Sequence, residues 1–97
     1  MMTTSGMTDE WAPVAFVISS QYRVTVVEAL ADGAALPSQI ARDAGVQIEH
    51  VSRALGRLRE RALVTLLVPE DRKKGRLYGL TSDGRCVWEQ IQTENIT

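Results

Sequence analysis

The sequence has little of the chemistry that enzymes and metal sites require. Among its 97 residues there is one cysteine, Cys86, and one histidine, His50. A single thiol cannot form an internal disulfide framework, and this pair does not amount to a catalytic triad or a metal-ligand cluster. No glycine-rich phosphate loop is present. We therefore expect no catalytic residues, no metal, no cofactor and no enzymatic activity.

Long apolar segments are also missing. No apolar run approaches the roughly 20 residues of a membrane span, and the N-terminus lacks the basic flank and apolar core of a signal peptide. The hydrophobic fraction of 44% is normal for a globular protein, and the length corresponds to one domain that can bury a core. We expect a soluble, cytoplasmic protein that does not bind membranes.

The net charge of −1 hides an uneven distribution. The segment from His50 to Arg76 carries a charge of +5, and the rest of the chain about −6. The overall charge argues against nonspecific coating of nucleic acid, whereas the local excess predicts one basic binding face. The basic residues of this segment are Arg53, Arg57, Arg59, Arg61, Arg72, Lys73, Lys74 and Arg76.

The first third of the chain has helical periodicity after a short polar start. Residues 1–8 are small and polar, so we predict a disordered tail and a domain over residues 9–97. Thr8 or Asp9 is a suitable helix cap, and Pro13 fits only a helix that has just begun. Ser19-Ser20 predicts a break and a new N-cap before apolar residues at helical spacing over 21–31. Residues 9–31 form either one bent helix or two.

A short helix, a glycine-containing turn and a longer helix follow. Pro37 predicts the start of the first, with Ile40, Ala41 and Ala44 facing inward, and Gly45 lies in the turn. The longer helix runs from about residue 48 to residue 61. This arrangement is a helix-turn-helix, and it needs the helix over 21–31 to complete its core. The inward positions of the longer helix are Val51, Leu55, Leu58 and Ala62.

The period then changes to that of strands. Residues 63–68 are β-branched and apolar, 69–75 form a charged turn, and 76–80 alternate as a returning strand. Thr81 or Ser82 caps a last helix with an apolar face of Val87, Trp88 and Ile91. The fold class is therefore mostly α with a small β-hairpin (α+β). A three-helix core, a hairpin called the wing, and a C-terminal helix make up a winged helix-turn-helix.

Several segments resemble one family of regulators. The stretch PSQIARDAGV (37–46) followed by HVSRAL (50–55) resembles the helix-turn-helix of MarR- and ArsR-like winged-helix regulators, and small archaeal members are the most similar. LRERALV (58–64) and KGRLYGLTSDG (74–84) resemble their passage into the wing and out of it. The resemblance implies DNA binding and transcriptional regulation. The metal-sensing cysteine pair of ArsR-like proteins is absent, and the long dimerisation helices of full MarR proteins are short here.

We expect the helix over 48–61 to enter the DNA major groove and the basic part of the wing, residues 69–76, to contact the backbone or minor groove. Arg53 and Arg57 lie one turn apart and can each grip guanine with two hydrogen bonds. His50 and Ser52 lie near the helix start, where side chains meet bases. The remaining candidates are Gln47, Glu49 and Ser38 at helix starts, and Arg72, Lys73, Lys74 and Arg76 in the wing.

Other residues have more than one interpretation. Glu49 either accepts a bond from cytosine or caps its own helix, and Arg59 and Arg61 are expected to pair with acidic residues near the hairpin. Gly56, exposed in mid-helix, either permits close approach of a backbone or is simply tolerated at a cost of about 1 kcal/mol. For Cys86 a buried structural thiol is favoured over a redox sensor, and an intermolecular disulfide stays open if the thiol is exposed.

The sequence thus predicts a homodimeric, sequence-specific regulator that binds double-stranded DNA. The N- and C-terminal helices are expected to pair across a two-fold axis through Trp11, Val14, Trp88 and Ile91. The alternative is a winged-helix module that docks proteins and does not recognise DNA. No residue identifies an effector ligand or an operator.

Overall fold

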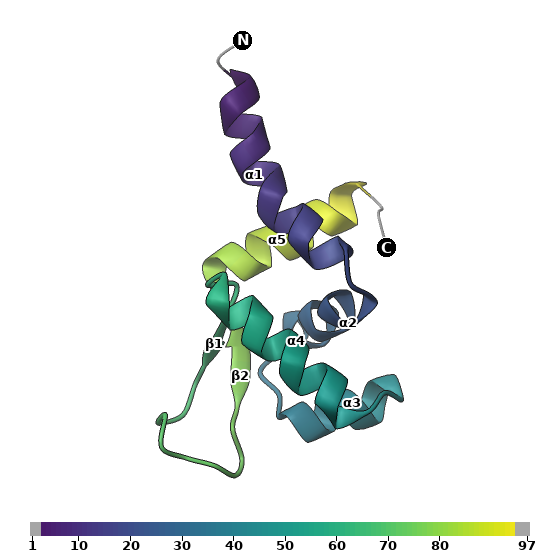
Figure 1. Ribbon diagram of the computed structural model, residues 1–97, viewed down its shortest axis with the longest axis vertical. Helices are drawn as coiled ribbons and strands as arrows, with labels where there is room; N and C mark the ends of the chain where they lie inside the picture. The colour runs from purple at the N-terminus through teal and green to yellow at the C-terminus, as the bar shows by residue number, and fades with distance from the viewer. Residues whose placement is uncertain (1–2, 95–97) are drawn as a thin grey trace.

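The computed structural model describes the backbone of residues 3–94 and the side chains of residues 11–94. Within these residues, helices and a two-stranded antiparallel hairpin give the predicted α+β class (Figure 1). The elements are α1 (Thr3–Ile18), α2 (Gln21–Ala31), α3 (Pro37–Ala44), α4 (Ile48–Glu60), β1 (Val64–Leu66), β2 (Tyr78–Leu80) and α5 (Ser82–Glu94).

The predicted break at Ser19-Ser20 is confirmed, and residues before and after it form two helices. Ser20 has an extended backbone, and its side chain accepts a hydrogen bond from the Arg23 N–H at 3.4 Å. At this cap the chain turns by 110° between α1 and α2. No single helix in the described part of the chain has the length and apolar character of a membrane span. Taken together, α1 from Trp11 onward and α2 have both, but the chain bends between these two helices.

The start of α1 differs from the prediction. The helix begins at Thr3 rather than after Thr8 or Asp9, so Pro13 lies inside it instead of in its first turn. There the proline removes one backbone hydrogen bond from the helix. The predicted boundary between a tail (1–8) and a domain (9–97) therefore falls within a helix, and the division itself stays a prediction.

The core lies where α2, α3 and α4 meet, with α1 and α5 covering one side. Leu30 of α2, Ile40 of α3 and Leu55 of α4 are at most 2% exposed. Val17 of α1 and Ile91 of α5 are fully buried against them. Side chains at a spacing of three and four residues in each helix supply this core, as the sequence predicts. Two predicted inward positions are wrong, because Ala44 and Ala62 are exposed.

Ala62 is exposed because it ends α4 instead of continuing it. Its φ is +62°, the left-handed conformation. The Leu63 N–H bonds the Leu58 carbonyl at 3.0 Å and the Ala62 N–H bonds the Arg59 carbonyl at 2.9 Å, the pattern of a Schellman cap. Glycine usually occupies this position because a Cβ disfavours positive φ.

Replacing Ala62 by glycine is therefore expected to stabilise the protein. The Cβ strain of a left-handed residue is about 1–2 kcal/mol, offset in part by the extra freedom of glycine in the unfolded chain. We expect a gain of about 0.5–1 kcal/mol in the free energy of unfolding, measured by urea denaturation. The reverse change at the glycine cap of α3, Gly45→Ala, has the same backbone requirement (φ +72°) and should destabilise. A loss of stability in Ala62→Gly would contradict the left-handed conformation of residue 62.

The hairpin is shorter than predicted. β1 pairs with β2 in the register Val64–Leu80 and Leu66–Tyr78, so the strands cover three residues each rather than 63–68 and 76–80. Ala35 extends this small sheet, because its N–H and carbonyl each bond Tyr78 at 3.0 Å. The connecting residues leave the ladder after the Leu67 N–H bonds the Leu77 carbonyl at 2.7 Å. The wing is thus a short ladder with a long basic loop.

α5 closes the domain over the end of α4. The Thr81 hydroxyl donates to the Ala62 carbonyl at 2.7 Å and accepts from the Gly84 N–H at 3.0 Å, which confirms the predicted cap. Gly84 and Val87 lie on the buried face of α5. Cys86 is exposed, so the prediction of a buried structural thiol is wrong.

Candidate nucleic-acid interface

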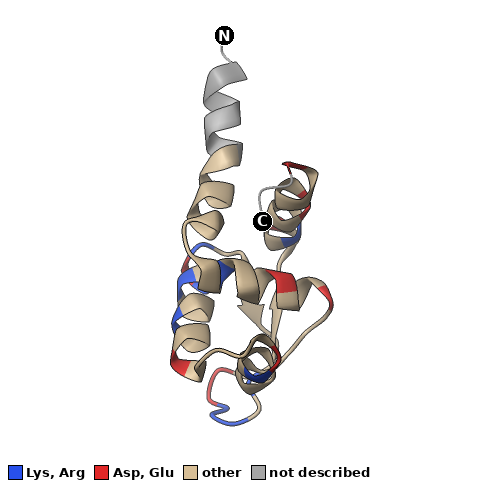
Figure 2. Cartoon of the chain, turned by 90° about the vertical axis from the view of Figure 1, so that its right-hand side faces the viewer, with Lys and Arg blue, Asp and Glu red and all other residues tan. Residues whose placement is uncertain are grey.

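The exposed face of α4 is the centre of the candidate site. Val51, Leu55 and Leu58 turn one face of the helix into the core. The helical repeat therefore places the opposite face in solvent. Figure 2 shows Lys and Arg along one side of the molecule and at the tip of the hairpin. The exposed residues on this face are Glu49, Ser52, Arg53, Gly56, Arg57 and Glu60.

A groove runs between α4 and the wing, and we call it the wing-side groove. It brings together candidates from three separate segments: Ser38 at the start of α3, Ser52 on α4, and Lys73 with Arg76 in the wing. Tyr78 is buried beside it and joins β2 to Ala35. The wing and the helix-turn-helix therefore form one continuous surface.

A second groove, the α2-side groove, lies on the other flank of α4. His50, Arg53 and Arg57 line it together with Tyr22 and Arg23 of α2. The His50 and Tyr22 rings stack with centroids 4.3 Å apart and planes 6° apart, which fixes the imidazole against α2. No acidic side chain of the described residues lines this groove, so the charge of its lining is positive.

The arginines of α4 differ in what holds them. Arg59 bonds the Glu70 carboxylate, as expected from the sequence, and Arg57 lies 3.7 Å from Glu60 in an exposed pair of little strength. Arg61, expected to pair with an acidic residue, instead lies over the Phe16 ring, 4.0 Å from its centroid. Arg53 makes no ion pair or side-chain hydrogen bond within residues 11–94, so its guanidinium is available to a partner.

Phe16 joins α1 to the rest of the domain. A second guanidinium, that of Arg23, also lies 4.0 Å from the ring centroid and donates to the Phe16 carbonyl at 2.8 Å. Two cations on one aromatic ring are each attracted to its π system. These contacts hold the guanidinium groups of Arg61 and Arg23 against α1, and Arg23 also lines the α2-side groove.

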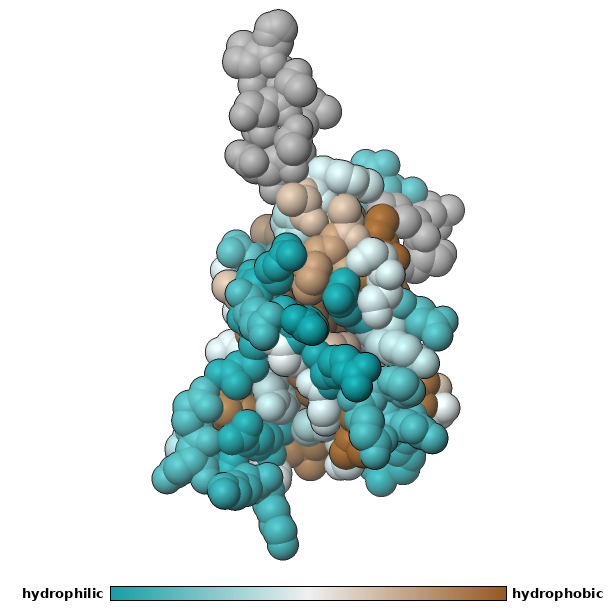
Figure 3. Space-filling view, in the orientation of Figure 1, coloured by the Kyte–Doolittle hydropathy of each residue, from teal (hydrophilic) through white to brown (hydrophobic). Residues whose placement is uncertain are grey.

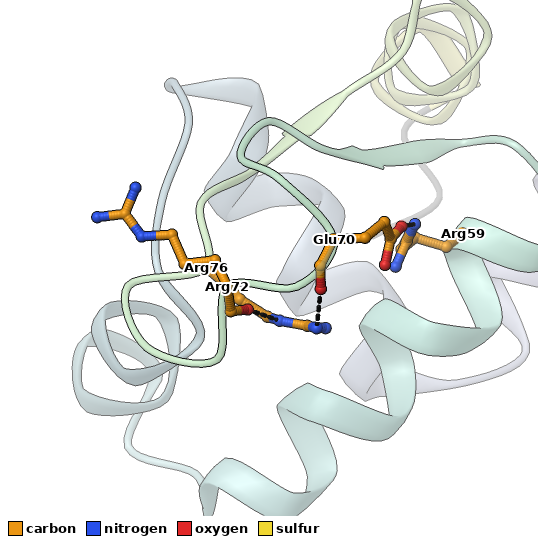
Figure 4. Close-up of polar contacts among 4 residues, drawn as sticks. All are labelled: Arg59, Glu70, Arg72 and Arg76. Carbon is orange, nitrogen blue, oxygen red and sulfur yellow. Dashed lines mark hydrogen bonds and ion pairs between the residues drawn. The ribbon is translucent and has the colours of Figure 1, made fainter.

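The wing loop is ordered by its own arginines. The Arg76 guanidinium donates to the Arg72 and Glu70 carbonyls at 2.6 and 2.8 Å, and the Glu70 carboxylate faces Arg59 (Figure 4). Because Arg59 donates a hydrogen bond and its positive charge lies close by, the pKa of Glu70 is lower than its ordinary value. The loop is thus tied to α4, which leaves Lys73 and Lys74 exposed at its tip.

The other predicted residues lie at the start of α4 and in the wing loop. Gln47 is the N-cap of α4 without a side-chain cap bond, and Glu49 lies exposed in the first turn. Arg72 is exposed, and its Nε donates to the Lys74 carbonyl at 3.2 Å. The described residues contain no group of three or more His, Cys, Asp or Glu that could hold a metal ion.

Neither Tyr22 nor Arg23 was among the residues that the sequence predicted for the site. Both line the α2-side groove because α2 packs against α4. The spacing of Tyr22 and Arg23 within α2 contains no signal of that neighbour. The excess of arginine in 50–76 was the available indication of a basic face.

Comparisons with known proteins agree with this fold. A sequence model of the family described as "HVO_A0261 N-terminal domain" matches residues 11–95. No curated protein sequence matches the chain. Solved structures are similar at low identity, which shows a shared fold and confirms the resemblance to MarR- and ArsR-like winged helix-turn-helix domains.

Three such structures illustrate the similarity. The transcriptional repressor BigR from Xylella fastidiosa has a TM-score of 0.72 at 21% identity, over 95% of this chain and 90% of that one. A second structure is Mb0332 (fragment 1–100) from Mycobacterium bovis, a homodimeric winged helix-turn-helix DNA-binding domain and possible ArsR-family regulator. Its TM-score is 0.64 at 20% identity, over 94% of this chain and 84% of that one. RV1404 from Mycobacterium tuberculosis has a TM-score of 0.69 at 23% identity, over 95% of this chain. The chain spans 66% of the length of RV1404.

Proposed function

The chain belongs to the HVO_A0261 N-terminal domain family, and we propose that it binds double-stranded DNA sequence-specifically and regulates transcription. In this proposal it acts in the cytoplasm and has no enzymatic activity. The observation that carries the proposal is the exposed face of α4, where the unpaired Arg53 lies beside a basic groove with no acidic lining among the described residues. The similar structures BigR, a transcriptional repressor, and Mb0332, a DNA-binding domain, support the same function.

The geometry suits a helix seated in the major groove. An α-helix with its side chains is about 10–12 Å wide, and the major groove of B-DNA is about 12 Å wide. With α4 in that groove, the DNA backbones that border it lie to either side of the helix. These are the positions of the wing-side groove and the α2-side groove. Each backbone therefore meets cationic side chains.

The candidate residues then divide by role. Arg53, with Ser52 and Glu49, projects from α4 toward base edges. His50 and Arg57 lie on the flank toward α2, where a phosphate passes. Ser38 lies in the first turn of α3, where free N–H groups and the helix dipole favour an anion. Phosphate contacts position the protein and base contacts provide specificity.

A second copy of the chain is the proposed partner on the opposite side of the domain. Mb0332 is a homodimer, and we propose pairing through α1 and α5 here. Val14 and Ile91, expected at this interface, are 1% and 0% exposed within one chain and so belong to its core. Trp11 is 43% exposed on α1, and apolar surface is visible near α1 and α5 in Figure 3. A dimer requires an operator with two half-sites, and a single half-site would contradict it.

The salt dependence of binding tests the role of the wing. Because Lys73 and Lys74 are exposed and free of the bonds that hold Arg76, we expect them to contact phosphate. In Lys73→Ala/Lys74→Ala, the slope of log affinity against log salt should fall by about two units, equally for all DNA sequences. The affinity is measured by fluorescence anisotropy on labelled duplexes from about 50 to 200 mM salt, the range over which phosphate contacts are resolved.

The matched control for the wing is Arg42→Ala/Arg85→Ala. It removes the same charge from exposed positions that line neither groove. Its slope should stay close to that of the parent protein. Equal slopes for the lysine variant and the parent would contradict backbone contact by the wing.

A further inference from the structure

Gly56 lies in the middle of α4, at a position where no feature of the described fold requires a glycine. Glycine is the least favourable helix residue after proline, because it loses the most backbone freedom on folding. Gly56 is exposed, and a Cβ built on it would meet nothing within 4 Å. Its backbone does not need positive φ. Any other residue except proline would therefore suit the folded domain better.

The other glycines of the described chain each have a reason within the fold. Gly33, Gly45 and Gly75 have positive φ. A Cβ on Gly84 would lie 2.0 Å from the Leu63 carbonyl oxygen, and a Cβ on Gly79 would lie 3.0 Å from Cδ1 of Leu67. Gly56 is the exception within residues 11–94. Nothing among the described residues requires the missing side chain, so a requirement for it would come from a partner of the chain.

The position of Gly56 indicates where that requirement arises. It follows Ser52 by one turn and Arg53 by three residues, so it shares their face of α4. The wing-side groove lies beside Ser52, and the α2-side groove lies beside Arg53 and Arg57. Gly56 is thus on the ridge between two grooves that have cationic lining.

We propose that Gly56 is the point of closest approach between α4 and DNA. The bare backbone at this residue contacts the base edges at the floor of the major groove, which lets the helix sit deep enough for Arg53 to reach its base. This inference rests on the proposed function and adds to it a residue that sets docking depth. It predicts opposite effects of one substitution on folding and on binding.

The test is Gly56→Ala, measured for both properties. The melting temperature should rise by about 4 °C, because alanine favours the helix and its Cβ enters open space. The affinity for a selected operator duplex should fall about tenfold, because the added methyl holds the helix away from the bases. Gly56→Leu should weaken operator binding further. Glu28→Ala is the matched control: it improves helix propensity at an exposed position of α2 that lines neither groove, so operator affinity should not fall.

Two outcomes would overturn the inference. A lower melting temperature in Gly56→Ala would mean that the fold itself needs glycine. Unchanged or tighter operator binding in Gly56→Ala would mean that DNA does not approach this residue. If Arg53→Ala weakens binding in the same assay while Gly56→Ala does not, the proposed function stands and the docking inference fails. If neither variant weakens binding, the proposed function fails as well.

Discussion

Arg53→Ala is expected to weaken binding to a selected operator by about 5- to 150-fold, which corresponds to about 1–3 kcal/mol. The side chain is exposed, lines the α2-side groove, and makes no ion pair within the described residues. A free guanidinium on this face can bond guanine O6 and N7 together, so its loss should also relax the base preference at one position. Competition with duplexes substituted at each position in turn measures both effects.

The matched control is Arg85→Ala, which removes the same charge from an exposed position of α5 that lines neither groove. Its affinity should remain within about twofold of the parent, since surface changes are usually small. If Arg53→Ala and Arg85→Ala bind the operator equally well, base reading by Arg53 is excluded. The module that docks proteins through the same fold would then become the better hypothesis.

Gly84→Ala is expected to lower the free energy of unfolding by about 2–3 kcal/mol. A Cβ at this position would lie 2.0 Å from the Leu63 carbonyl oxygen and 3.0 Å from Leu80 Cδ2. Because the Leu63 carbonyl also accepts the Thr81 N–H at 3.1 Å, neither β1 nor α5 can move without breaking this junction. Urea denaturation of parent and variant measures the change.

The control for Gly84 is Ser82→Ala, at an exposed position in the first turn of the same helix. Its change in stability should be below about 0.5 kcal/mol. A similar small change in Gly84→Ala would show that α5 does not pack as closely on Leu63 as the structure has it.

Local signals in the sequence were sufficient to place the helices from α2 onward, but not the start of α1. Ser20 caps α2, Pro37 begins α3, and α4 ends within one residue of the predicted limit. Each of these features depends on a few neighbouring residues. The errors arise at the ends of elements: Ala62 leaves the helix because the chain turns into β1, and the strands are shorter because backbone pairing stops after the Leu67 N–H bonds the Leu77 carbonyl.

The candidate site was only partly predictable. The sequence located the basic segment, but it could not show which arginines have partners within the chain. Arg59 is occupied by Glu70, eleven residues away, and Arg61 by Phe16 of α1. Arg53 differs from them only through the three-dimensional arrangement. Nor could the sequence show that no part of the described chain approaches Gly56, the observation from which the inference about DNA docking starts.

Selection of bound duplexes from a random-sequence DNA pool at moderate salt tests sequence-specific DNA binding most directly. The purified chain is mixed with the pool, bound duplexes are recovered and amplified, and enrichment is followed by sequencing. We predict one enriched motif with two half-sites, whose spacing reports the geometry of the dimer. The absence of any enriched motif, with only weak binding that disappears as salt rises, would contradict sequence-specific regulation and favour the protein-docking alternative.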